Sequence, residues 1–231
     1  MTEQERDNLS HGMRSAARKG DLAEVKRLVA AGAQVDSIGY DMTALQLAAQ
    51  EGHLPVMEFL VENGAQIDLK TVSEAPPLNH AILYGHIHAV KFLLEAGARV
   101  DIGDHNGWQP LHHAANGVDR VGAALCLIAF GADVDARDRL GWQPLHVAAG
   151  RGREDMASFL LGAGANPYAA NNRGHTPMWL AEDKHPETFA VFAEWERHCG
   201  ERWRREEMVR DIHAHWKRVK KHFPSAPKPS L

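Results

Sequence analysis

A Gly-Ala pair recurs along this chain at a nearly constant interval. The copies that keep this register begin at Gly32, Gly64, Gly97, Gly131 and Gly164. The interval is about 33 residues, which is typical of repeat proteins. A unit this small cannot bury its apolar face alone and is stabilised by stacking on its neighbours.

A second marker keeps the same period. An apolar residue recurs in step with the Gly-Ala pair, and in four of its five copies it follows a proline. Its positions are Leu45, Leu78, Leu111, Leu145 and Met178. Because two independent markers agree from Gly32 to Met178, we predict an array of similar units rather than one or two globular domains.

Local signals within each unit predict two short helices. Pro77, Pro110, Pro144 and Pro177 suit the first turn of a helix, where the missing N–H has no helical partner to lose. A second helix carries apolar pairs such as Leu160-Leu161 and ends at the glycine of Gly-Ala, which tolerates the positive φ of a helix end. Turns rich in Asp, Asn and Gly then connect the units.

These motifs resemble the ankyrin repeat. The match is strongest in the unit that contains Pro144-Leu145-His146-Val147-Ala148-Ala149, Gly152, Leu160-Leu161 and Gly164-Ala165. The resemblance spans about residues 13–195 and gives six units, of which the outer two are modified as caps. It implies an all-α fold, an ankyrin-repeat solenoid of stacked helix pairs with hairpin turns, capped by a C-terminal helix.

The repeats depart from the family pattern in several places. The fourth has one extra residue near Asn116–Asp119, and the sixth has Glu182–Pro186 where Gly-His is expected. Each departure changes the local surface, through either drift or a partner contact. We divide the chain into a flexible N-terminus (1–12), a repeat domain (13–196), a basic amphipathic helix (197–223) and a disordered tail (224–231).

Charge is unevenly distributed along the chain. The net charge is −4, yet residues 197–231 hold ten Lys and Arg against four Asp and Glu, so the first 196 residues carry −10. The two cysteines, Cys126 and Cys199, cannot form a disulfide framework and fit a reducing compartment. The chain lacks a long apolar run and an apolar N-terminal signal, so we expect a cytoplasmic location.

Catalytic and metal-binding patterns are absent from the sequence. No phosphate-binding loop, His-Glu-x-x-His or Gly-x-Ser-x-Gly motif occurs, and no Cys/His set has zinc-site spacing. In the family, the histidine at His112 and His146 closes the helix turn by hydrogen bonds, and the Gly-His histidines His53 and His86 are also structural. We therefore expect no catalytic residues, no metal, no cofactor and no small-molecule substrate.

Partner-binding positions follow from the resemblance, because ankyrin partners usually contact hairpin tips and the inner helices. Trp108 and Trp142 occupy the same position in adjacent units, where they either contact a partner or pack on the neighbouring hairpin. Large aromatic residues beside arginine match the composition of binding hot spots. The predicted positions are Tyr40, Met42, Tyr84, His105, Asn106, Trp108, Arg137, Arg139, Leu140, Trp142, Arg151 and Arg173.

The predicted function is non-catalytic protein–protein interaction, as an adaptor, inhibitor or neutralising partner that is monomeric alone. The partner protein is not identified by the sequence. One alternative is a regulatory protein that contacts nucleic acid or anionic membrane through Lys217–Lys221 of the basic helix; another is an enzyme with an unrecognised site. The basic helix can also be a solvated cap of the last repeat, or an amphipathic helix that binds a partner through Met208, Ile212, Trp216 and Val219.

Overall fold

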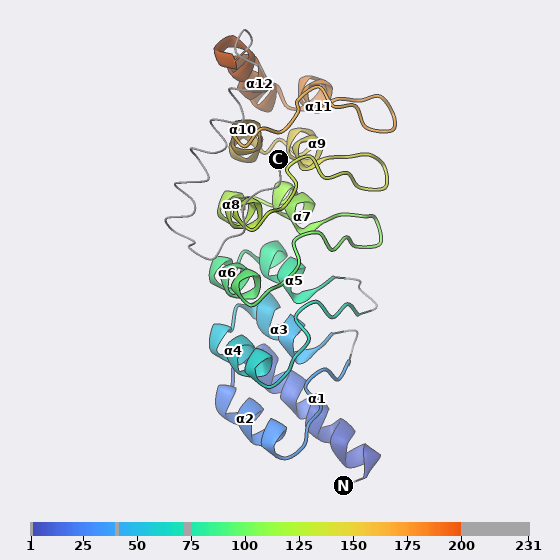
Figure 1. Cartoon of the computed structure of the whole chain (residues 1–231), viewed down its shortest axis with the longest axis vertical. Coiled ribbons are helices and arrows are strands. Elements are labelled where there is room, and N and C mark those ends of the chain that lie inside the picture. Colours follow the sequence, from blue (N-terminus) through green and yellow to red (C-terminus); the bar gives the residue numbers. More distant parts are fainter. Residues whose placement is uncertain (1, 40–41, 72–74, 200–231) are drawn as a thin grey trace. The chain divides into compact units, whose positions relative to one another are not determined.

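The computed structural model describes residues 2–39, 42–71 and 75–199 (Figure 1). These residues form twelve α-helices and no extended strand, only an isolated bridge between Gly39 and Met42. The helices are α1 (Glu3–Lys19), α2 (Leu22–Ala30), α3 (Ala44–Glu51), α4 (Leu54–Glu62), α5 (Pro77–Tyr84), α6 (Ile87–Glu95), α7 (Pro110–Asn116), α8 (Val121–Ala129), α9 (Pro144–Gly150), α10 (Glu154–Gly162), α11 (Pro177–Lys184) and α12 (Pro186–Cys199). The predicted all-α class is confirmed.

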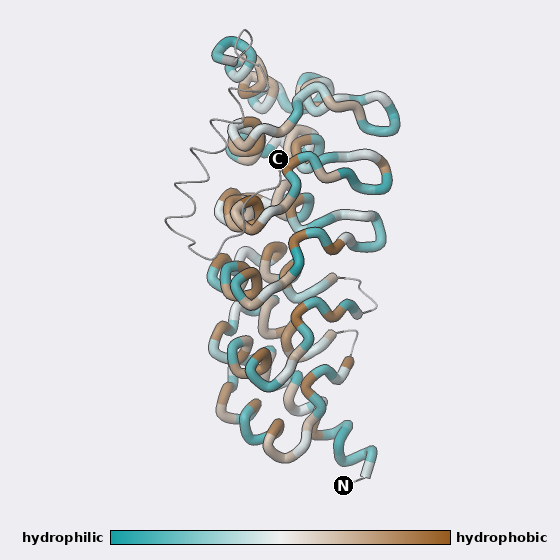
Figure 2. The backbone as a smooth tube through the Cα atoms, viewed as in Figure 1, coloured by the Kyte–Doolittle hydropathy of each residue, from teal (hydrophilic) through white to brown (hydrophobic). Residues whose placement is uncertain are grey.

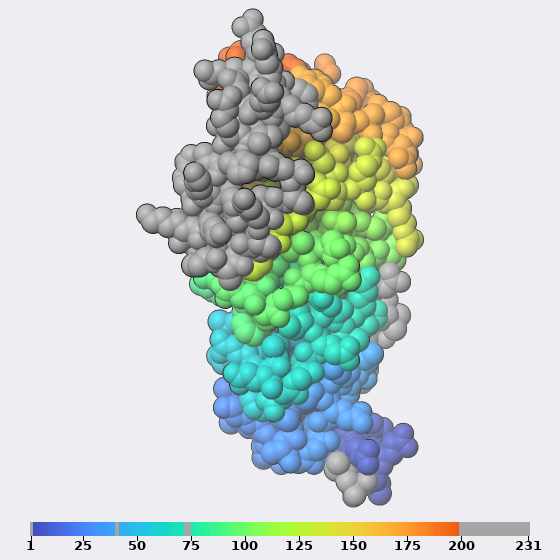
Figure 3. All heavy atoms as spheres, viewed as in Figure 1, coloured from blue at the N-terminus to red at the C-terminus, as the bar shows by residue number. Residues whose placement is uncertain are grey.

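The chain divides into two compact units, residues 1–99 and 100–231. In the first, α1, α3 and α5 contact one another in chain order, and α2, α4 and α6 form a second row (Figure 1). In the second, α7, α9 and α11 form one row and α8, α10 and α12 the other. In the space-filling view, the repeats of each unit form successive bands of colour (Figure 3).

Apolar side chains from both rows form the core of each unit. Leu45 and Leu78 are fully buried in the first unit, and Leu111, Leu145 and Phe192 in the second. The tube coloured by hydropathy shows α8 as apolar along its length (Figure 2), and five of its residues are buried. The recurring leucine of the sequence is thus a fully buried core residue in four repeats.

Helix boundaries follow the residues that the sequence singled out. All four first-turn prolines begin a helix, at α5, α7, α9 and α11. The five glycines of the in-register Gly-Ala pairs have φ between 88° and 100°, a conformation that costs other residues steric strain. Both predictions are confirmed, and each glycine turns the chain from a second helix toward the next hairpin.

The sequence predicts a flexible N-terminus over residues 1–12, and the structure places the start of α1 within it, at Glu3. A capping box fixes this start: the Thr2 side chain accepts the Glu5 N–H, and the Glu5 carboxylate accepts the Thr2 N–H. Further along the helix, the buried Ser10 hydroxyl accepts the N–H of Gln34. These hydrogen bonds make residues 3–12 part of the first helix pair.

The predicted boundary at residue 196 falls inside α12, which runs to Cys199. Most of the predicted basic helix and all of the predicted tail, residues 200–231, lie outside the described part of the chain. The same holds for Lys217–Lys221, on which the nucleic-acid and membrane alternative depends.

Buried side chains tie the start of a first helix to the following hairpin. In α9, the Gln143 N–H donates to His146 Nδ1 over 3.1 Å, and His146 Nε2 lies 3.1 Å from the His175 carbonyl oxygen. Because Nδ1 accepts, Nε2 must carry the proton, so the imidazole is neutral. His112 makes the same pair of contacts, with the Gln109 N–H and the Trp142 carbonyl oxygen. The structural role expected for both histidines is confirmed.

A second set of histidines joins neighbouring helix pairs at the loop between the two helices. His53 Nε2 lies 3.0 Å from the Arg18 carbonyl oxygen, and His86 Nε2 lies 2.9 Å from that of Gln50. In the sixth repeat, which lacks the Gly-His pair, His185 makes the equivalent contact with the Gly150 carbonyl oxygen. The departure in that repeat therefore preserves the hydrogen bond.

Burial lowers the pKa of His112 and lowers the pKa of His146 to about 4. An unfolded histidine has a pKa near 6.5, so on acidification the unfolded chain takes up its proton first. The stability that neutral His146 contributes is therefore fully present above pH 6.5. It is lost as the pH falls toward 4, where protonation would remove the Nδ1 acceptor.

We predict that His146→Gln flattens this pH dependence. Gln46 occupies the equivalent position in α3, where its Oε1 accepts the Thr43 N–H and its Nε2 donates to the Ala75 carbonyl oxygen, so glutamine fits the role. Between pH 7 and pH 4.5, the wild type should lose on the order of 2 kcal/mol more unfolding free energy than the variant in urea titrations. His88→Gln, at an exposed site, should behave like the wild type. An equal pH response of wild type and His146→Gln would contradict the prediction.

Candidate functional site

Three hairpin tips of the second unit share one hydrogen-bonding scheme. In each, one side-chain oxygen accepts two backbone N–H groups, those two and four residues further on: Asp104 from Asn106 and Trp108, Asp138 from Leu140 and Trp142, and Asn171 from Arg173 and His175. A glycine with positive φ completes each turn, as Gly141 does at 74°. The backbone at each tip is therefore fixed by its own side chain.

Adjacent tips are also joined to each other. The Arg139 N–H donates to the Asn106 carbonyl oxygen over 3.1 Å, and the Asn172 N–H donates to that of Leu140 over 3.0 Å. The Arg137 guanidinium donates to the Ala170 carbonyl oxygen. These bonds hold the three tips in register as one continuous edge.

A cleft of about 370 Å³ lies within the second unit, between the hairpins and the ends of the first helices. We call it the tryptophan cleft. Five of its nine lining residues are predicted partner-binding positions: Trp108, Leu140, Trp142, Arg151 and Arg173. The other four are Asp138, Val147, Gly150 and Lys184.

Both tryptophans of the cleft are half-buried. The Trp108 indole N–H donates to Asp138 Oδ2 over 3.0 Å, which anchors the ring to the next hairpin. The Trp142 ring centroid lies 6.0 Å from that of His146, and the ring passes beside Gly150, where a Cβ atom would lie 3.5 Å from it. Of the two roles considered for these tryptophans, Trp108 does pack on the neighbouring hairpin. Part of each indole nevertheless stays accessible to solvent.

The charged residues at the cleft are mostly basic. Arg151, Arg173 and Lys184 are exposed, and none of them forms an ion pair with a residue in the described part of the chain. The one lining carboxylate, Asp138, already accepts two backbone N–H groups and the Trp108 indole. The cleft therefore presents three cationic groups beside one carboxylate, and none of the three forms an ion pair in the described part of the chain.

The remaining predicted positions lie elsewhere. His105, Asn106, Arg137 and Arg139 are exposed on the hairpins but do not line the tryptophan cleft. Met42 and Tyr84 belong to the first unit, and Tyr40 lies outside the described residues. These positions stay predictions.

Sequence reasoning missed four lining residues. Lys184 lies one repeat length after Arg151, so the period could have found it. Val147 and Gly150 are three positions apart on α9, a spacing that places both on one helix face. Asp138 has the sequence context of an ordinary turn residue, and only the structure shows that it anchors Trp108.

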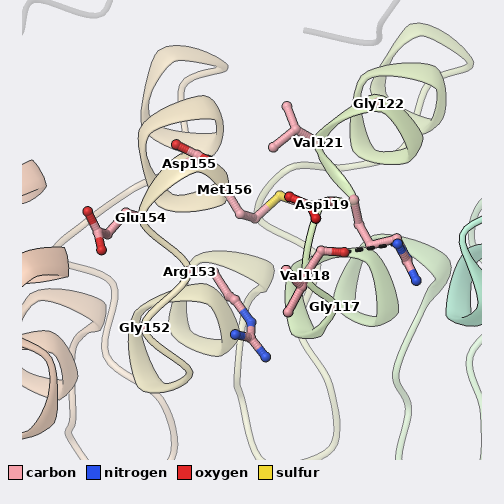
Figure 4. Close-up of a pocket in the computed structure, with 11 residues that line it drawn as sticks. Gly117, Val118, Asp119, Val121, Gly122, Gly152, Arg153, Glu154, Asp155 and Met156 are labelled. Atoms are coloured by element: carbon pink, nitrogen blue, oxygen red, sulfur yellow. Dashed lines mark hydrogen bonds between the residues drawn. The ribbon is translucent and has the colours of Figure 1, made fainter.

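The loop that holds the extra residue of the fourth repeat lines a second cleft, of about 420 Å³ (Figure 4). Arg153 and Met156 face the loop of Gly117–Val121 across it. Within this loop Asp119 has a φ of 52°, in the left-handed region. Arg153 takes the place of the histidine used at other junctions, and its Nε donates to the Asn116 carbonyl oxygen over 3.2 Å. The hydrogen bond between neighbouring repeats is thus kept here, with arginine as its donor.

Two substitutions at Asp138 would distinguish its hydrogen bonds to the turn backbone from its hydrogen bond to the Trp108 indole. In Asp138→Asn, the remaining oxygen can still accept the two backbone N–H groups, as Asn171 does, but the Trp108 indole loses its acceptor. We expect Asp138→Asn to lower the unfolding free energy by about 1 kcal/mol and Asp138→Ala by about 2–3 kcal/mol in urea titrations. Equal losses would show that the backbone bonds contribute little beyond the indole bond.

Membrane spans and metal sites are not found among residues 2–39, 42–71 and 75–199. No helix there combines the length and the apolar character that crossing a bilayer requires. Nor do three or more His, Cys, Asp or Glu side chains gather there as ligands for one ion.

Comparison with known proteins agrees with this architecture. The chain matches 67 residues of human Ankyrin repeat domain-containing protein 39 at 43% identity, which is 28% of this chain and 36% of that protein, so it spans little more than a third of that relative. Among solved structures, the human ASB11 ankyrin repeat domain aligns with a TM-score of 0.71 and 27% identity, covering 79% of this chain and 82% of that one.

A second structural neighbour is a chain in the complex of the predatory endopeptidase Bd0816 from Bdellovibrio bacteriovorus with immunity protein Bd3460. It aligns with a TM-score of 0.71 and 25% identity over 79% of this chain and 97% of that one. The family model described as "Ankyrin repeats (3 copies)" matches residues 4–71, 69–138 and 120–200. With most of its length matched, this chain belongs to the ankyrin repeat family.

Proposed function

We propose that this chain is a non-catalytic protein-recognition module that binds its partner at the tryptophan cleft. Ankyrin repeats are generally protein–protein interaction modules. The observation that carries the proposal is the pair of half-buried tryptophans, Trp108 and Trp142, beside cations without ion-pair partners among the described residues. Tryptophan and arginine are the residue types that most often dominate binding energy at protein interfaces.

The hydrogen bonds of the hairpins support binding to a surface that is already formed. The three tips are fixed by Asp104, Asp138 and Asn171 and are joined to one another through backbone bonds. A surface ordered before association loses little conformational entropy when a partner binds. We therefore expect the cleft to keep its shape on binding.

Among the possible roles, we favour that of a neutralising partner or inhibitor over that of an adaptor. The likeness to a chain in the endopeptidase–immunity protein complex, which covers 97% of that chain, supports this choice. In such a role the chain would bind one target and block it by covering its surface.

Trp142→Ala tests the proposed function. Immobilised wild type and variant would be exposed to lysate of the source cells, and the retained proteins quantified by mass spectrometry. We expect the variant to retain at least tenfold less of the specific partner than the wild type does. Truncating a central hot-spot residue costs about 2 kcal/mol or more of binding free energy. Its thermal midpoint should stay within a few degrees of the wild type, since the ring is only half-buried.

Tyr168→Ala provides the matched control, because Tyr168 is an aromatic residue of the same unit, 48% exposed and outside the cleft. It should retain the same proteins as the wild type. If Trp142→Ala also retains them all, the cleft is not the binding site and the proposed function fails.

A further inference from the structure

We infer that the tryptophan cleft recognises an acidic segment of the partner protein. In this segment an apolar side chain, which enters the cleft, is flanked by carboxylates. This inference rests on the proposed protein-binding function and adds the chemistry of the partner. It is carried by the placement of charge around the cleft and by the apolar character of its walls.

The charge around the cleft opposes that of the chain. Residues 1–196 carry −10, yet Arg151, Arg173 and Lys184 gather at one cleft of this acidic body. None of the three has an ion-pair partner among residues 2–39, 42–71 and 75–199. Three like charges beside a single lining carboxylate leave a net positive charge at the cleft, so a carboxylate from outside would be attracted to it.

The chain does not supply that carboxylate within the cleft. Asp138 is the only acid among the nine lining residues, and its oxygens are held by the Trp108 indole and by backbone N–H groups. It therefore fixes the cleft wall, forms no ion pair with the three cations, and leaves them in excess of acids at the cleft. Arginine is suited to bind a carboxylate through two parallel hydrogen bonds, which gives both Arg151 and Arg173 a defined ligand.

The walls of the cleft favour an apolar side chain between the acids. Leu140 is 57% exposed, and Val147 and the half-buried Trp142 also line the cleft. Gly150 has no side chain to fill the space beside the Trp142 ring. An aliphatic side chain of the partner would bury this surface, at about 25 cal/mol for each Å² removed from water.

A single-stranded nucleic acid is the competing ligand, since it too combines negative charge with groups that stack on tryptophan. The observations favour a protein. Three cations would contact only a few phosphates, and the negative charge of the body would repel the rest of a strand. Leu140 and Val147 match aliphatic side chains better than base edges.

The test uses three probes on the full chain. They are the blocked hexapeptide Asp-Glu-Leu-Leu-Glu-Asp, its neutral isostere Asn-Gln-Leu-Leu-Gln-Asn, and a twelve-nucleotide oligothymidine. Binding is followed by NMR through the indole N–H signals of Trp108 and Trp142. We expect the acidic peptide to shift both signals, to bind about tenfold more tightly than the neutral one, and to weaken with added salt.

Charge-reversal variants test whether the cations of the cleft cause the preference for the acidic peptide. Arg151→Glu/Arg173→Glu should weaken the acidic peptide at least tenfold, and Lys184→Glu alone should weaken it several-fold. The control Arg6→Glu/Lys19→Glu makes the same change in net charge at exposed positions of α1 and should change binding less than twofold. Circular dichroism confirms that each variant keeps its helices.

The inference is overturned if the acidic peptide does not bind, if the neutral peptide binds equally well, if the charge reversals have no effect, or if oligothymidine binds more tightly. These outcomes leave the proposed function standing whenever Trp142→Ala still loses the captured partner. Failure of the proposed function would instead appear as unchanged capture by Trp142→Ala.

Discussion

Three junctions between consecutive repeats depend on one hydrogen-bonding arrangement, in which a buried side chain joins the first turn of a helix to the next hairpin. Gln46, His112 and His146 each accept the N–H of the residue before their helix and contact a carbonyl oxygen of the following hairpin. An acceptor and a donor on the same side chain are required, and neutral histidine and glutamine both provide them. Each bond crosses from one repeat to the next, and those of His112 and His146 fix hairpins on which the tryptophan cleft is built.

Two repeats show what happens when this arrangement is not available. Asn79 occupies the equivalent position in α5, but the residue before that helix is Pro76, which has no N–H to donate. Both polar atoms of the Asn79 side chain are buried without a hydrogen-bond partner in the described structure, which costs free energy. In α11 the position holds Trp179, which is 45% exposed and stacks on His175 with 4.0 Å between ring centroids.

The repeat pattern predicted the fold well because the residues that hold each unit recur. The prolines, the Gly-Ala glycines and His146 each satisfy a requirement of the backbone, so their positions can be found from sequence alone. The ends of the array do not share that pattern, and the Thr2–Glu5 capping box that starts α1 was therefore missed. The tryptophan cleft was found in part, through the recurrence of Trp108 and Trp142. The anchoring of Trp108 by Asp138 depends on side-chain direction, which periodicity does not reveal.

Scaffold and recognition are assigned to different residues of the same short hairpins. Asp138 and Gly141 hold the tip, whereas Leu140 and Arg139 at that tip are exposed and free to vary without loss of the turn. In the proposed mode of binding, the tryptophans and Leu140 would supply most of the affinity through buried area, and the cations would select among partners by charge. Substitution of Arg151 or Lys184 would then change the partner without changing the fold, because neither side chain takes part in the bonds between repeats.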